Sequence, residues 1–159
     1  GQSIHPLVQD PEHALEIELP FLQHVLGEFL LIPLMLRDQS WETAHAVGEA
    51  LAFALRGRDA LLVASSDLSH FYPQFTAYPL DAEILRRIEA LDAEGVIRAN
   101  EEGVGFACGR GAIAAVLWAA RRWGADQARV VGYATSGDVT GDFDKVVGYG
   151  AAVVFQADS

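Results

Sequence analysis

The sequence predicts an α/β domain whose central sheet is mainly parallel or mixed and is flanked by helices. Apolar runs of strand length alternate along the chain with segments whose apolar residues recur at helical spacing. A chain of 159 residues with 51% hydrophobic and 21% charged side chains has the composition of one globular domain with a sizeable core. We therefore expect residues 1–159 to form a single domain.

Four strands are expected. The near-continuous apolar runs at Phe29–Leu36 and Leu61–Ser65 are typical of strands buried on both faces. Because a helix is expected between these two runs, they predict a right-handed parallel crossover. The later runs at Arg129–Thr135 and Val146–Phe155 are joined by a short connection, which predicts an antiparallel pair.

The helices are predicted from amphipathic spacing and from end signals. Asp10 and Pro11 favour a helix start before the apolar periodicity that runs from Leu15 to Leu26. Ser40 is an expected N-cap for a helix that reaches about Arg56. Further helices are expected at Asp81–Leu91, Glu94–Glu102 and Ala112–Trp123, with an irregular loop at Pro73–Pro79.

Charge and cysteine content narrow the classes of function. The formal net charge of −11 argues against a nucleic-acid partner, because such binding depends on clustered Lys and Arg. The single cysteine excludes an internal disulfide. We find no signal-like amino terminus and no apolar span of membrane length, so we expect no membrane partner and a cytoplasmic location.

The stretch Ala64–Tyr72 is the first candidate site, because polar side chains follow an expected buried strand there. Asp67 and His70 are three residues apart, so the carboxylate could orient the imidazole or share a reacting proton with it. The alternative is that Asp67 or a neighbouring serine caps a helix and that His70 only covers its flank.

Other candidate residues also lie at the ends of expected elements. The lone Cys108 precedes a helix, and both the helix amides and Arg110 would favour its thiolate form; alternatively it is a small buried hydrophobic side chain. His13 lies at a helix start, where a surface or capping role is the alternative. A polar loop from Ser136 to Asp142 follows the third expected strand.

Four motifs carry a resemblance to a known family. They are Glu12-His13-Ala-Leu-Glu16-Ile-Glu-Leu-Pro20-Phe21-Leu22-Gln23, Ser65-Ser66-Asp67-Leu-Ser-His70, Cys108-Gly109-Arg110-Gly111 and Tyr133-Ala-Thr-Ser-Gly137-Asp138. Together, and in this order, they resemble the MEMO family, also called AmmeMemoRadiSam system protein B. The resemblance covers nearly the whole chain.

The resemblance implies a fold similar to class III extradiol dioxygenases and a metal pocket of two His and one Cys. Carried over residue by residue, it implies metal ligands at His13 and Cys108, with Asp67 and His70 as the pocket's Asp and His beside the metal. We expect Asp67 and His70 to be catalytic, and we expect substrate-binding groups at Arg110, Ser136 and Asp138. Fe(II) is the favoured metal, with Cu(I) or Zn(II) as alternatives, because imidazole and thiolate ligands do not choose firmly among them. The implied partners are a radical-SAM protein, an AMMECR-type protein and a small-molecule substrate.

One part of the family pattern is absent. The family's other His ligand belongs to an amino-terminal Pro-His-Ala-Gly segment that this sequence lacks, so the chain resembles the carboxyl-terminal half to two-thirds of a full member. His5 could substitute, but its Ser-Ile-His-Pro context does not resemble the missing segment. Either a longer native chain or another chain would then supply the third ligand.

Three functions compete at this stage. The first is a metal-dependent redox protein, a dioxygenase-like enzyme of the AmmeMemoRadiSam system. The second is a metal-containing module that binds a ligand or protein without turnover. The third is a thiol hydrolase that uses Cys108 and His70.

Overall fold

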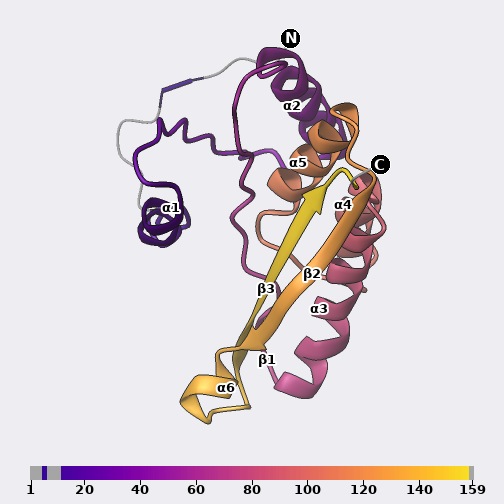
Figure 1. The fold of residues 1–159 in the computed structure, drawn as a ribbon. Helices are drawn as coiled ribbons and strands as arrows, with labels where there is room; N and C mark the ends of the chain where they lie inside the picture. The colour runs from indigo at the N-terminus through magenta and orange to yellow at the C-terminus, as the bar shows by residue number, and fades with distance from the viewer. Residues whose placement is uncertain (1–4, 7–11, 158–159) are drawn as a thin grey trace.

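A computed structural model describes residues 5–6 and 12–157 (Figure 1). Its elements are, in order, α1 (Leu19–Leu26), α2 (Trp41–Ala54), β1 (His70–Tyr72), α3 (Gln74–Glu89), α4 (Ala93–Glu101), α5 (Arg110–Arg122), β2 (Gln127–Thr135), α6 (Gly137–Thr140) and β3 (Val146–Phe155). The predicted helix start at Asp10 and Pro11 falls outside the described residues. Among the described helices, none has the length and apolar character needed to cross a membrane.

The described strands form a small antiparallel sheet in the order β1-β3-β2. The hairpin of β2 and β3 is its main part, with pairing from Gln127 opposite Phe155 to Thr135 opposite Gly148. Figure 1 shows the two long strands side by side, with α3 running along them. The predicted antiparallel pair is therefore confirmed, and the described residues have a mixed α/β fold.

The core lies where α3, α4 and α5 meet. Ile84, Val96, Ile97 and Leu117 are at most 2% exposed, and they come from the apolar faces of these three helices. Burying a side chain of this size stabilises a fold by about 2 kcal/mol relative to leaving it in water. The amphipathic spacing within Asp81–Leu91 therefore predicted the buried face of the second half of α3, where Ile84, Leu85 and Ile88 are buried.

Two helices begin at side-chain caps. The hydroxyl of Ser40 accepts a hydrogen bond from the Thr43 amide over 3.3 Å, so the predicted N-cap of α2 is confirmed. The Asp92 carboxylate accepts from the Gly95 amide over 2.9 Å at the start of α4. Each cap pairs a backbone donor that the helix itself leaves unsatisfied.

The predicted strands at Phe29–Leu36 and Leu61–Ser65 are wrong for this structure, because both segments lie outside helices and strands. Among the described residues, no backbone-to-backbone hydrogen bond joins either segment to another part of the chain. A strand needs a neighbour for its amides and carbonyls, and neither segment has one here. The predicted parallel crossover and mainly parallel sheet are consequently wrong for the described residues.

The predicted loop at Pro73–Pro79 is also wrong, because α3 starts at Gln74. Pro73 occupies the position before the helix, where its missing N–H leaves no helical bond unmade. Pro79 lies inside the helix, between Ala77 and Asp81, and both of these residues are fully buried. Tertiary burial along this face outweighs the cost of an interior proline.

Candidate functional site

Asp67 and His70 contact each other, as predicted. The Asp67 Oδ2 lies 3.3 Å from His70 Nε2, and the two side chains are 48% and 29% exposed. The His70 ring also lies near the rings of Phe71 and Phe106, with centroids 5.7 and 5.5 Å away. The carboxylate can therefore orient an imidazole that solvent still reaches.

A backbone irregularity lies directly beside His70. His70 pairs with Val147 and Tyr72 with Val146, so Phe71 is an extra residue on its strand. Phe71 has a φ of 62°, in the left-handed region that a phenylalanine rarely adopts. Bulges of this kind redirect the side chains next to them, and strained residues cluster at functional sites. The bulge thus helps to set the direction of the His70 side chain.

Cys108 adjoins the same aspartate. The Asp67 amide donates to Cys108 Sγ over 3.3 Å, and the Cys108 amide donates to the Asp67 carbonyl over 3.1 Å. The Ser66 hydroxyl lies 3.7 Å from the sulfur, and Cys108 is exposed. An exposed thiol, a carboxylate and an imidazole are thus held on one short stretch of surface. The alternative of a small buried hydrophobic cysteine is wrong for this structure.

The glycines of the Cys-Gly-Arg-Gly motif allow this approach. A Cβ on Gly109 would lie 2.8 Å from the Ser65 carbonyl oxygen, and the Gly109 amide donates to Ser66 Oγ over 2.8 Å. The Gly111 amide donates to Gln39 Oε1 over 2.6 Å, and a Cβ there would lie 2.7 Å from that oxygen. Larger side chains at either position would push the turn, and with it the thiol, away from its neighbours.

His13 is exposed and directly precedes the turn at residues 14–18 that leads into α1. Ala14 directly follows His13, and its carbonyl accepts a hydrogen bond from the Ser65 hydroxyl over 2.8 Å. Ser65 adjoins Ser66, which contacts Cys108, so the His13 segment is anchored to the same stretch of chain. Within residues 5–6 and 12–157, however, no three His, Cys, Asp or Glu side chains are arranged to hold a metal ion. Among the described residues, His13 and Cys108 are therefore not part of a three-ligand group.

The three expected substrate-binding residues occupy different settings. Arg110 is the first residue of α5, and its Nε is buried with no hydrogen-bond partner among the described residues. Ser136 Oγ accepts from the Val147 amide over 3.0 Å. Val147 pairs with His70, so the backbones of Ser136 and His70 lie on either side of β3, roughly 10 Å apart by strand spacing.

Asp138 is engaged in local structure. Its carboxylate accepts from the Thr135 amide over 2.7 Å and from Gln74 Nε2 over 3.1 Å. The Thr135 hydrogen bond is the main cause that lowers the pKa of Asp138. These hydrogen bonds of Asp138 fix the backbone at the end of β2. Arg110, in contrast, keeps a donor that has no partner among the described residues.

The structure contains a buried polar cluster that the sequence did not reveal. Asp81 is fully buried and accepts from the Ser69 amide over 2.8 Å and from the Tyr133 hydroxyl over 2.7 Å. Burial, with Asp81 as the second cause, raises the pKa of Tyr133. A Cβ on Gly148 would lie 1.9 Å from Asp81 Oδ2, so a glycine is required there. Because Ser69 precedes His70, this cluster anchors the backbone at the candidate site.

The fold and this surface define a mixed α/β protein that presents a thiol, a carboxylate and an imidazole together beside a short antiparallel strand. Residues 2–153 match the model of a family described as Memo-like protein. The chain belongs to this family, which confirms the resemblance drawn from its motifs.

Curated relatives agree with this assignment. A MEMO1 family protein of Methanothermobacter thermautotrophicus is 43% identical over 140 residues, covering 87% of this chain and 50% of the relative. Those of Methanopyrus kandleri and Nitrosopumilus maritimus are each 40% identical and cover 91% and 88% of this chain, and 52% and 51% of the relatives. The chain thus spans about half the length of the curated relatives it matches.

Proposed function

We propose that this chain carries part of the active site of a metal-dependent redox enzyme of the dioxygenase-like class. The observation that supports the proposal is the position of Asp67, whose carboxylate contacts His70 and whose backbone contacts Cys108. In this proposal His70 is the general acid or base and Cys108 is a soft metal ligand, and each of them contacts Asp67.

His13 and Cys108 would hold the metal, with Fe(II) favoured and Cu(I) or Zn(II) as alternatives. When bound, such an ion supplies Lewis acidity and, for iron or copper, one-electron chemistry. An open catalytic site normally takes three protein ligands. Since no three-ligand group occurs among the described residues, the third ligand would come from elsewhere in a longer chain or from another chain.

The chain's own residues have distinct parts in this proposal. His70 would move the proton of a bound substrate, and Asp67 would hold the ring in the required orientation. Arg110 would bind an anionic or carbonyl oxygen, because its buried Nε retains an unused donor. Ser136 would contribute its hydroxyl proton, which its contact with Val147 leaves free to donate. Asp138 would act indirectly, by fixing the loop that follows β2.

The two other functions account for less of the geometry. In a thiol hydrolase the imidazole would activate the sulfur, yet the described contacts of Cys108 Sγ are with Asp67 N and Ser66 Oγ. A binding module without turnover would leave the ordered contact of Asp67 with His70 unused. A radical-SAM protein and an AMMECR-type protein remain the proposed partners, in a cytoplasmic setting.

Metal titration tests the ligand assignment. We expect anaerobically purified chain to bind Fe(II) or Zn(II) more weakly than the full-length relative from Methanothermobacter thermautotrophicus, because it offers fewer ligands. Cys108→Ala and His13→Ala should each weaken binding further. The matched control His24→Ala, a change at an exposed histidine on α1, should not. The assignment is wrong if the wild type binds no better than both ligand variants.

A turnover assay separates an enzyme from a binding module. Oxygen consumption by the metal-loaded protein should be measured with and without a radical-SAM protein and should fall in His70→Ala. If metal binds but no substrate screen gives His70-dependent consumption, the binding module is the better description.

A further inference from the structure

Among the described residues, two apolar segments make no backbone-to-backbone hydrogen bonds, although Ala64 packs against the core and Ser65 contacts Ala14 through its side chain. We call residues 29–36 and 61–65 the open segments. Their exposed large hydrophobic residues are Phe29, Leu30, Leu31, Ile32, Leu34, Met35, Leu61 and Val63. Leu30 is 96% exposed and Ile32 73%. Single exposed apolar residues are ordinary, but runs of them mark surfaces that bind another chain.

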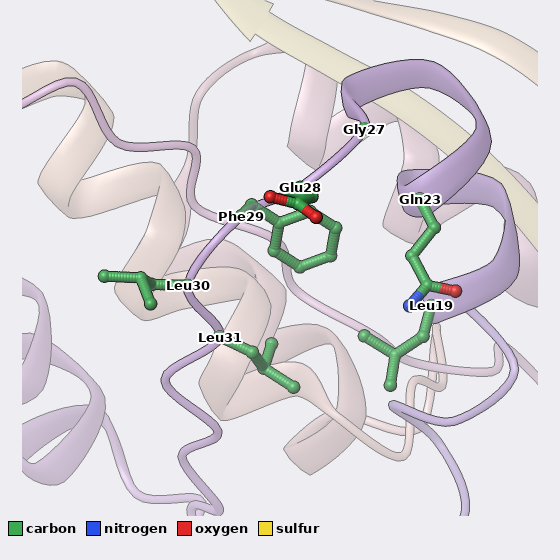
Figure 2. A pocket seen from close by; sticks show the side chains of 7 residues that line it. All are labelled: Leu19, Gln23, Gly27, Glu28, Phe29, Leu30 and Leu31. Carbon is green, nitrogen blue, oxygen red and sulfur yellow. The ribbon is translucent and has the colours of Figure 1, made fainter.

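The first open segment is apolar on both sides. Figure 2 shows Leu30 directed away from α1, while Phe29 and Leu31 lie on the side of Leu19 and Gln23. Together with Gly27 and Glu28 these residues line a hollow of about 610 Å³. A segment with apolar side chains on two opposite sides matches a strand whose two faces are both to be covered.

The backbone of the open segments is unpaired as well. No backbone-to-backbone hydrogen bond from either segment occurs within the described part of the chain. The segments also contain no Asp, Glu, Lys or Arg. Free backbone groups and uncharged apolar side chains suit an apolar polypeptide that adds β-strands, and they offer nothing to a charged ligand.

We propose that the open segments form a docking surface for the part of a Memo-family chain that this sequence does not span. The length of the relatives indicates what binds this surface. They are about twice as long as the region that this chain matches in them, so about half of each relative has no counterpart in this sequence. Once docked, residues 29–36 and 61–65 pair as strands with that part and bury their apolar side chains. The inference concerns assembly and does not rest on the proposed redox activity.

Hydrogen exchange on a chimera tests the docking. The half of the Methanothermobacter thermautotrophicus relative that this chain does not match is joined to this chain through a protease-cleavable linker. We expect amides of both open segments to be protected roughly 100-fold or more over the isolated chain, because strand amides exchange only on opening. Unchanged protection would overturn the proposal. So would protection that rises with the concentration of this chain alone, since a second copy would then be the occupant.

Charge substitutions locate the surface. After linker cleavage the two halves should remain together, and Leu30→Asp should raise their dissociation constant roughly tenfold or more because a buried unpaired charge is costly. The control Val139→Asp changes a 90% exposed residue on α6 and should leave the dissociation constant unchanged. Separation of the wild-type halves on cleavage, or equal effects of the two substitutions, would contradict the proposal. Neither measurement requires metal, so failure of the docking proposal can be distinguished from failure of the proposed redox function.

Discussion

The helices α1 and α5 are both amphipathic, yet only α5 is buried. Six residues of α5 are buried, among them Ile113 and Leu117, whereas none in α1 is. Phe21 and Val25 of α1 are 71% and 77% exposed. The comparison teaches that apolar spacing indicates which face a helix will bury, while burial itself depends on a partner element. We refer below to residues 68–157 as the packed part and to residues 12–36 as the open part.

The largest effect is expected at the buried carboxylate of the packed part. Asp81→Ala should lower the free energy of unfolding by about 4 kcal/mol, because it leaves the buried Ser69 amide and the half-buried Tyr133 hydroxyl unpaired and opens a cavity. The control Asp144→Ala removes an exposed carboxylate and should cost at most about 0.5 kcal/mol. Urea denaturation measures both, and equal costs would show that the cluster does not stabilise the fold.

A matched pair of truncations tests the comparison directly. Leu117→Ala on α5 should cost about 3 kcal/mol, because the side chain is 2% exposed and its loss leaves a cavity. Phe21→Ala on α1 should cost at most about 0.5 kcal/mol in the isolated chain. A large cost at Phe21 would show that the open part is packed in solution, and the contrast between the helices would then be wrong.

The smallest effect concerns a surface ion network on α3. Hydrogen bonds from Arg86 and Arg87 lower the pKa of Glu83 from its usual value of 4.5 to about 2. Because the folded-state pKa is the lower one, the stabilisation is present above about pH 4.5 and is lost as the pH falls towards 2. Solvent screening limits it to about 1 kcal/mol or less, since Arg86 is well exposed.

Glu83→Gln should therefore reduce stability slightly at pH 7 and leave it unchanged near pH 2. Denaturation at pH 7, 5, 3 and 2 would measure the difference, with Glu94→Gln on α4 as a control that has one longer ion pair. A difference that stays constant across this range would contradict the assignment to Glu83 ionisation.

Local signals predicted several features outside the open part. Ser40 was identified as a cap because its hydroxyl can serve a nearby amide, and that contact is present. The apolar run at Val146–Phe155 was identified as a strand, and its hairpin neighbour lies nearby in sequence. Asp67 and His70 were predicted to interact because they are three residues apart, and their side chains are in contact in the structure. In each case the partner lies within a short stretch of chain.

Predictions failed where the partner is distant or absent. The apolar runs at Phe29–Leu36 and Leu61–Ser65 have the composition of buried strands, but no described segment pairs with them. Asp81 was placed only at a helix start, because nothing local indicates that Ser69 and Tyr133 converge on its carboxylate. Contacts between positions far apart in the chain cannot be read from local spacing.

The docking of Cys108 against Asp67 has a practical consequence. The chain contains one cysteine, and it is exposed. A fluorophore or spin label attached to that sulfur would therefore occupy one known position, joined through Asp67 to the carboxylate that contacts His70. Its emission or mobility would report, without further engineering, when a ligand or another polypeptide reaches this surface.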